Sequence, residues 1–354
     1  MSRSLSTLWS LWHEPRWINA HLRILFVSTK EGFTRIEIWQ KGQADNMDLN
    51  MRSYQDESDY WKIRDFLRRI FLLNDRRELS WQTYRFDYWR WHGIQNLGHG
   101  NLERDVFIWE DAKGQIAAVL NPEGPGNVYL QVDPGYRTPE LEDQMLLIAE
   151  EKLAVTRSDN RPRLNVFAEQ HDAIRQDLLE RRGYQRSNIW ERHHRCQLSH
   201  PAPDVVLPEG YKVRALGDVD ELPARSFLSW KAFHPHEPIE DFDGWEWYQN
   251  IQRAPLYRRD LDLVATSPGG EMCSFCTIWF DDVTRVGSFE PVGTALEYQR
   301  LGLGKAVIHE GMRRLGLLGV EMAFVGSGSE GASAFYTSIG FTHSDLSEMW
   351  TKVL

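Results

Sequence analysis

The chain has 354 residues, of which 41 are Lys or Arg and 51 are Asp or Glu, so its formal net charge is −10. This length predicts two domains, and the acidic balance argues against the basic surface that nucleic-acid-binding proteins carry. No apolar run approaches the roughly 20 residues that cross a bilayer, so we expect neither nucleic acid nor a membrane as a partner.

Residues 1–50 show weak hydrophobic patterning and have no counterpart later in the chain. We treat them as an N-terminal arm of unknown structure. Three origins stay open: a disordered arm, a small accessory element, or translation from an upstream start codon, with Met47 and Met51 as alternative starts.

From about residue 52 the pattern of elements repeats, which indicates a duplicated domain. In each copy the hydrophobic pattern and the turn residues predict a helix, three strands, a second helix and a fourth strand. A helix ending in Gly plus an aromatic residue and a last strand complete the copy. In the first copy the elements before the last strand are expected at 59–73, 105–110, 115–120, 127–134, 141–154, 163–168 and 177–184. In the second copy they are expected at 218–233, 261–266, 271–280, 285–294, 304–318, 321–326 and 334–341. We predict domains at 51–198 and 205–354, with the joint in the Pro-rich run SHPAPDVVLPEG.

Two motifs that could suggest redox or metal chemistry lie on predicted strands. Cys273 and Cys276 form a CxxC, but their odd separation on a strand points the two sulfurs to opposite faces, which favours a structural role. His193 and His194 are adjacent on a strand and also face opposite ways, so we expect no zinc or other metal. Three cysteines are too few for a disulfide framework, which fits the cytoplasm.

The strongest chemical signal is a glycine-containing loop between a strand and a helix in the second copy. The strand ending at Thr294 leads into Gln299, Arg300, Gly302 and Gly304. A loop that enters a helix offers unpaired backbone N–H groups and the positive end of the helix dipole, and glycines let the backbone approach phosphate oxygens. This predicts a site for a pyrophosphate.

Two other phosphate-binding motifs do not fit the same loop. A dinucleotide fingerprint needs a third glycine where Val307 stands. A P-loop needs Gly where Gln299 stands and Ser or Thr where Ala306 stands.

Strand, glycine loop, helix, strand and then the run ASAFYTSIGF resembles the acetyl-CoA-binding core of the GNAT (GCN5-related) N-acetyltransferase superfamily. The resemblance is specific over about 284–341, and it extends to 205–354 and then to 52–198 through the order of elements. It implies an α/β fold of two tandem GNAT-like domains, each a mixed, mostly antiparallel sheet flanked by helices. The tandem layout is similar to that of the mycothiol synthase family, and the substrate does not follow from that likeness.

The resemblance implies acetyl-CoA as the acyl donor and no metal. In GNAT proteins the strand before the loop splays from its neighbour and pairs with the pantetheine arm, and the loop holds the pyrophosphate. In the final-helix loop Ser329 stands where the family usually has Asn. The implied cofactor-binding residues are Val292, Thr294, Gln299, Arg300, Leu301, Gly302, Leu303, Gly304, Lys305 and Ser329.

Two residues are expected to carry the chemistry. Tyr336 matches the family's Tyr in YxxxGF, which protonates the leaving thiolate, although packing on an apolar helix face is the other interpretation. Glu290 is expected to act as the base or to bind the amine. The alternative interpretation is a strand residue that faces solvent. The glutamate shares strand parity with Val292 and lies two positions after Ser288, where the family's base often stands, and Pro291 is suited to a bulge that re-aims its side chain.

The acceptor pocket is expected near the first helices of the second copy and their loop. Candidates there are His234, His236, Glu237, Trp245 and Trp247, although each could equally belong to an ordinary surface loop.

The first copy resembles a GNAT domain that has lost its cofactor site. It keeps the entry sequence VDPGYR, but Glu140 and Glu142 stand where glycines are needed and would repel a pyrophosphate. Leu179 occupies the position of the catalytic Tyr. We therefore expect an acyltransferase that moves an acetyl group from acetyl-CoA to a primary amine of a small molecule or peptide at the second domain. The alternative is a non-catalytic acyl-CoA-binding regulatory or structural protein.

Overall fold

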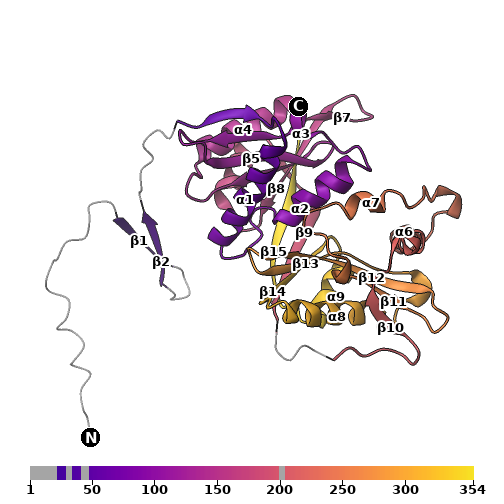
Figure 1. Ribbon diagram of the computed structural model, residues 1–354. Helices are drawn as coiled ribbons and strands as arrows, with labels where there is room; N and C mark the ends of the chain where they lie inside the picture. The colour runs from indigo at the N-terminus through magenta and orange to yellow at the C-terminus, as the bar shows by residue number, and fades with distance from the viewer. Residues whose placement is uncertain (1–21, 29–33, 41–47, 199–203) are drawn as a thin grey trace, which may run out of the picture. The chain divides into compact units, whose positions relative to one another are not determined.

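A computed structural model of the chain describes residues 22–28, 34–40, 48–198 and 204–354 (Figure 1). The chain divides into two compact units, 1–49 and 50–354. In the first unit, strands β1 (Leu22–Ser28) and β2 (Thr34–Gln40) pair antiparallel. The rest of the expected N-terminal arm, and residues 199–203 of the expected joint, lie outside the described residues.

The second unit holds both copies of the repeat, and the predicted elements are confirmed with small shifts at their ends. The first half contains β3 (Asn50–Ser53), α1 (Glu57–Leu73), α2 (Thr83–Tyr88), a π-helical turn η1 (Trp89–Ile94), α3 (Leu102–Asp105), β4 (Phe107–Glu110), β5 (Ile116–Gly124), β6 (Asn127–Val132), α4 (Pro139–Lys152), β7 (Val155–Thr156), β8 (Pro162–Glu169), α5 (Ala173–Arg181) and β9 (Gln185–Gln197). The sequence did not predict α2 and η1, because the aromatic residues of 81–91 show no clear helical period.

The second half repeats this order. It contains β10 (Lys212–Ala215), η2 (Val219–Glu221), α6 (Leu222–Phe233), η3 (Ile239–Asp241), α7 (Tyr248–Ile251), η4 (Arg259–Leu261), β11 (Asp262–Thr266), β12 (Met272–Asp281), β13 (Val286–Thr294), η5 (Leu296–Tyr298), α8 (Leu303–Leu317), β14 (Met322–Ser327), α9 (Glu330–Ile339) and β15 (His343–Val353). The predicted α/β fold, with helices flanking a mixed, mostly antiparallel sheet, is confirmed.

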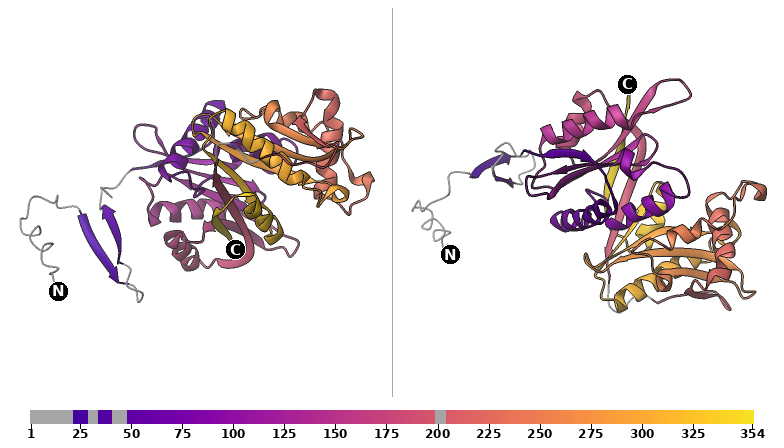
Figure 2. Two further views of the ribbon diagram at one scale, coloured as in Figure 1. Left: turned by 90° about the horizontal axis from the view of Figure 1, so that it is seen from below. Right: turned by 45° about the horizontal axis from the view of Figure 1, so that its top comes forward.

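The two halves exchange their last strands and thereby share one sheet. The strand order is β10-β11-β12-β13-β14-β9-β15-β8-β6-β5-β4-β3, with β7 beside β8. Along this order the strands pair antiparallel except β13 with β14 and β6 with β8, which are parallel. Strand β9 of the first half therefore lies against β14, and β15 of the second half lies against β8 (Figures 1 and 2). The domain limits 51–198 and 205–354 stay a prediction, and each segment supplies one strand to the other's sheet.

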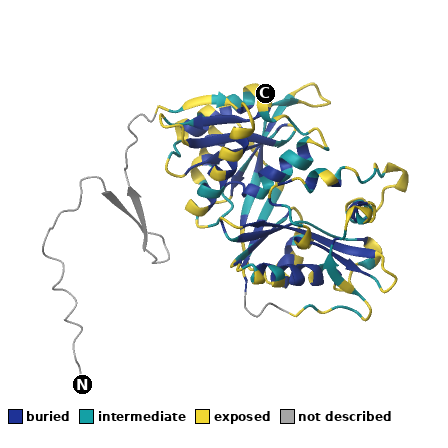
Figure 3. Cartoon of the chain, viewed as in Figure 1, coloured by how far each residue is buried: buried dark blue, intermediate teal, exposed yellow. Residues whose placement is uncertain are grey.

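Buried residues lie on both faces of this sheet (Figure 3). On one face of the second half, α8 covers an apolar cluster that includes Ile278, Phe289, Val307 and Val325. The central strand β12 is buried along its whole length, because elements cover both of its faces. The three cysteines are buried free thiols. Within the described part of the chain, no helix has the length and apolarity needed to cross a membrane.

Candidate active site

A gap opens between β13 and β14 at the predicted position. The two strands pair in parallel only from Val286 with Met322 to Phe289 with Val325. Beyond that point β13 continues to Thr294 and β14 to Ser327 without pairing to each other. The backbone of 292–294 still pairs with β12 on its other edge, and its edge toward β14 has no strand partner, so an extended ligand could pair there.

A β-bulge in β13 decides which way Glu290 points. Cys276 pairs with Val292 and Ile278 pairs with Phe289, so β13 has one extra residue at this position. The bulge predicted at Pro291 is therefore confirmed. Because an extra residue reverses the alternation of side chains, Glu290 does not share a face with Val292, contrary to what strand parity indicates.

Contacts on each side show the result of this reversal. Val292 packs against the cluster beneath α8. Glu290 lies on the opposite face, where one carboxylate oxygen is 3.8 Å from the position that a Cβ of Gly326 would take. Val325 faces α8. Because neighbouring residues on a strand face opposite sides of the sheet, a side chain at Gly326 would point toward the first half.

The glycine loop is exposed and open to a ligand. Gly302 is the N-cap of α8 with φ of 81°, and Arg300 also has a positive φ of 64°. Gly304 is needed for close packing, because a Cβ there would lie 3.2 Å from Oγ1 of Thr294 and 3.3 Å from the ring of Phe335. A cavity beside the loop is lined by Leu301, Gly302, Lys305 and His309 among others. The first-turn N–H groups of α8 thus meet open space rather than buried protein.

The structure brings most of the predicted cofactor residues together in one strand end, loop and helix start. Thr294 is fixed by a 2.8 Å hydrogen bond between its hydroxyl and that of Ser274. Leu303 is buried, so only its backbone could meet a ligand, whereas Gln299, Leu301 and Lys305 are exposed.

Ser329 stands apart from this group, at the start of α9 beyond β14. Its hydroxyl already accepts a hydrogen bond from the N–H of Ala332 as the helix N-cap. It is exposed.

Tyr336 approaches the gap from the α8 side of the sheet. Its side chain is 8% exposed and packs in the cluster beneath α8, with its ring 5.9 Å from that of His194 and 6.1 Å from that of Phe341. Burial, followed by the charge of Glu290, raises the pKa of the Tyr336 phenol. The phenol is therefore protonated at neutral pH and able to donate that proton.

Glu290 is a half-buried carboxyl with no side-chain ion pair or hydrogen bond to the described residues. Burial, followed by repulsion from Glu191, raises its pKa to about 7. A carboxyl near this value can take a proton at neutral pH and release it again, as a general base must. Ser288, which stands where the family's base is often found, makes a structural contact: its hydroxyl donates a hydrogen bond to the side-chain oxygen of Gln82 at 2.7 Å.

Helix α2 of the first half covers the face of the sheet where Glu290 lies. The indole N–H of Trp279 donates to the backbone oxygen of Glu290 at 2.6 Å. The ring of Tyr84 stacks on Trp279 at 6.2 Å, and the ring of Tyr88 meets it edge-on at 5.9 Å. Sequence reasoning did not predict these three aromatic residues for the site, because no local signal places α2 against β12.

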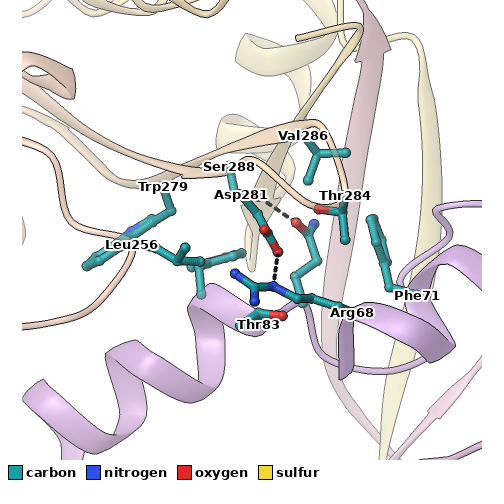
Figure 4. A pocket seen from close by; sticks show the side chains of 11 residues that line it. Arg68, Phe71, Thr83, Leu256, Trp279, Asp281, Thr284, Val286 and Ser288 are labelled. Carbon is teal, nitrogen blue, oxygen red and sulfur yellow. Dashed lines mark hydrogen bonds and ion pairs between the residues drawn. The ribbon is translucent and has the colours of Figure 1, made fainter. Parts of the chain in front are cut away.

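A small cavity lies between the same elements (Figure 4). Its walls include Trp279 and Ser288, and an ion pair of 3.0 Å between Arg68 of α1 and Asp281 of β12 crosses it. The two halves are thus tied by specific polar contacts at Asp281 and Ser288, and the first half contributes directly to this region.

The equivalent gap in the first half is filled. Strands β6 and β8 pair only from Asn127 with Asn165 to Val128 with Val166, and then separate. The next residues, Tyr129 and Phe167, stack face to face at 5.0 Å. They occupy the positions that Glu290 and Gly326 hold after the last pair in the second half. An aromatic pair closes one gap, whereas a glycine leaves the other open.

The start of α4 in the first half is also occupied by the protein itself. The carboxylate of Glu142 is fully buried and accepts hydrogen bonds from Arg137 at 2.5 Å and from Arg175 at 3.0 Å. Burial acts to raise the pKa of Glu142, but the two arginines outweigh it and lower the pKa to about 2. A permanent internal anion therefore lies near the helix start, while Glu140 is exposed.

The other acceptor candidates lie away from Glu290 or serve other contacts. His234 and Glu237 form a 3.0 Å pair on the surface, and Trp247 packs on the ring of His92 at 5.4 Å. His193 and His194 do face opposite ways: His194 bonds the hydroxyl of Ser327 at 3.0 Å, whereas His193 lies 3.4 Å from Glu78 of the first half.

Comparisons with known proteins agree with this geometry. Residues 220–341 match the model of the Acetyltransferase (GNAT) family. A GCN5-related N-acetyltransferase from Sphaerobacter thermophilus has a similar fold, with a TM-score of 0.60 and 16% identity, over 86% of this chain and 95% of that one. A tandem GNAT protein from the clavulanic acid biosynthesis pathway also has a TM-score of 0.60, with 14% identity, over 86% of this chain and 98% of that one.

Residues 220–341 thus carry a GNAT-type acetyltransferase domain, which supports an N-acetyltransferase, and the fold of the chain has the tandem layout of known GNAT proteins. Among curated relatives it is similar to a mycothiol acetyltransferase of Paenarthrobacter aurescens, with 26% identity over 269 residues, which are 70% of this chain and 76% of that protein. A mycothiol acetyltransferase of Pseudarthrobacter chlorophenolicus is 24% identical over 71% of this chain and 77% of that protein.

Proposed function

We propose that the second half transfers an acetyl group from acetyl-CoA to a primary amine of a small molecule or peptide. The observation that carries this proposal is the gap between β13 and β14, with Glu290 on one face of the sheet and Tyr336 on the other. A thioester that passes through the gap from the α8 side would meet both side chains.

In this proposal the acyl donor lies along the free edge of 290–294, with its pyrophosphate at the glycine loop. The N–H groups of the first turn of α8 and the exposed cations Arg300 and Lys305 support a diphosphate there. The remaining predicted contacts come from Val292, Thr294 and Ser329.

The acceptor amine approaches from the face that α2 covers. Glu290 takes a proton from the attacking amine, directly or through water, while the amine nitrogen forms a bond to the thioester carbonyl carbon. The carbon–sulfur bond then breaks, and Tyr336 protonates the leaving thiolate of coenzyme A. The carboxylate of Glu290, which has no ionic partner in the described part of the chain, suits an amine that is cationic in solution. The names of the curated relatives support a small-molecule acceptor. Three free thiols support the reducing cytoplasm as the location.

The proposal is tested by mixing the full chain with acetyl-CoA and a panel of primary amines and small peptides. Release of free thiol and formation of the acetylated amine in equal amounts are the expected result. Acetyl-CoA binding in calorimetry with no turnover on any amine would instead favour the non-catalytic alternative, and no binding at all would refute the site.

A further inference from the structure

The exchanged strand β9 brings charged residues of the first half next to Glu290. Strand β9 pairs with β14 so that His193 stands opposite Gly326. Cross-strand partners point to the same face, and the carboxylate of Glu290 lies over Gly326 on that face. Since side chains alternate along a strand, Glu191 also points to the side where Glu290 lies.

The charges of this cluster are paired with one another. The carboxylate of Glu191 lies 3.0 Å from a guanidinium nitrogen of Arg85 and 3.7 Å from the ring of His193. Arg85 also binds Glu123 through two hydrogen bonds of 2.7 and 2.6 Å, and His193 lies 3.4 Å from Glu78. Each of these three carboxylates therefore has a cationic partner, and Glu290 is left without one among the described residues.

The pairing keeps Glu191 ionised. Burial acts to raise the pKa of Glu191, but Arg85 and then His193 outweigh it and lower the pKa. Burial acts to lower the pKa of His193, but Glu78 and Glu191 outweigh it and raise the pKa to about 9. Glu191 therefore carries a fixed negative charge at neutral pH, beside a base that must change its charge during the reaction.

We propose that Glu191 is a positioning residue for acyl transfer, through which the first half holds Glu290 as a base that readily takes and returns a proton. The inference rests on the proposed function. It gives the first half, whose own gap is filled, a direct part in the chemistry of the second.

Other groups act on Glu290 from the elements packed around it, and they do not replace Glu191. Among the charged neighbours Glu191 raises the pKa of Glu290 most, Arg85 opposes it, and Glu123 and Glu78 act in the same direction more weakly. From the other elements, the charge of Glu290 acts on the phenols of Tyr84 and Tyr88 on α2, on the phenol of Tyr336 on α9 and on the thiol of Cys276 on β12, and burial is the largest cause that raises their pKa values. These groups are neutral at pH 7, so they add no fixed charge.

The test follows the titration of Glu290 in the full chain without any substrate. Protein labelled with ¹³C at the glutamate carboxyl carbons is titrated by NMR, and the Glu290 signal is assigned by its loss in Glu290→Gln. The signal is expected to titrate near pH 7. In Glu191→Gln the midpoint should fall by about one pH unit, because a neighbouring negative charge is lost.

Two further variants make the result specific. Glu191→Met should lower the midpoint in the same way, and it covers the case that an unpaired amide prevents folding of Glu191→Gln. Glu150→Gln removes a carboxylate that pairs with Arg182 and Lys352 elsewhere, and it should leave the midpoint unchanged. An unchanged midpoint in a folded Glu191 variant would overturn the inference.

Activity then separates this inference from the proposed function. If an acceptor is found, the acid limb of the kcat/KM profile should shift to lower pH in Glu191→Gln by the same amount as the NMR midpoint. If no amine is acetylated, the proposed function fails, while the NMR titration still decides the effect of Glu191. If the NMR midpoint shifts but the acid limb of the kcat/KM profile does not, Glu191 has no part in acyl transfer.

Discussion

Glu290 and Tyr336 face each other across the gap between β13 and β14 from opposite sides of the sheet. Glu290 lies over Gly326 on the side of α2, and Tyr336 packs beneath α8. Burial, followed by the charge of Glu290, raises the pKa of the Tyr336 phenol. In the proposed function this separation gives one face of the sheet to the acyl donor and the other to the acceptor.

Replacing Glu290 by Gln should lower kcat/KM by roughly 10²- to 10³-fold, because the amine loses its base. In the native protein the pKa of about 7 means that kcat/KM should fall as the pH is lowered through 7, since only the ionised carboxylate accepts a proton. Glu297→Gln removes an exposed carboxylate from the same segment and should have little effect. A pH profile of Glu290→Gln that keeps the native acid limb would contradict the role.

Tyr336→Phe should lower kcat by roughly 10²-fold and leave the KM for acetyl-CoA nearly unchanged, because the ring still packs and only the proton donor is lost. Steady-state kinetics with the identified acceptor measure both values. Tyr136→Phe is the control, since this phenol bonds Asp111 in the first half. Full turnover by Tyr336→Phe would leave packing as the only role of Tyr336.

Gly302→Glu should raise the dissociation constant of acetyl-CoA at least about tenfold, because a carboxylate at this position repels the pyrophosphate. Gly114→Glu is a matched control: Gly114 also has a positive φ, 77°, and open space around it, but it lies in the turn between β4 and β5 of the first half. Calorimetry with acetyl-CoA checks both variants. Equal affinity in Gly302→Glu and the native protein would rule out the loop as the phosphate site.

Gly326→Phe should abolish turnover, because it would rebuild in the second half the ring with which Phe167 fills the first. Gly326→Ala is expected to keep most of the activity, since its Cβ would meet the Glu290 carboxylate at an ordinary contact distance of 3.8 Å. The thiol-release assay compares the two variants at equal folded content. Activity in both would show that the gap is not the path of the thioester.

Glu142→Gln should destabilise the first half by about 3 to 5 kcal/mol, because it leaves Arg137 and Arg175 without their buried anion. The pKa of Glu142 is lowered to about 2 from its ordinary value of 4.5, so its contribution to stability is present above pH 4.5 and is lost as the pH falls toward 2. Urea unfolding of both proteins between pH 3 and 7 checks this. A native-like dependence on pH in the variant would assign the effect to other carboxylates.

The sequence alone determined the repeated order of elements, the glycine loop and the Tyr336 position. These features are local: hydrophobic period, turn residues and loop glycines act within a few positions of the chain. Glu142 and Leu179 indicated in the same way that the first half lacks a working site.

Only the tertiary structure decided which residues surround the reaction. The bulge at Pro291 turned Glu290 to the face opposite Val292, which simple alternation could not predict. The exchange of β9 and β15 placed Glu191 of the first half beside the gap of the second, and α2 was brought over Trp279 in the same way. Strand pairing and helix docking join residues that are far apart in sequence, so no local pattern encodes them.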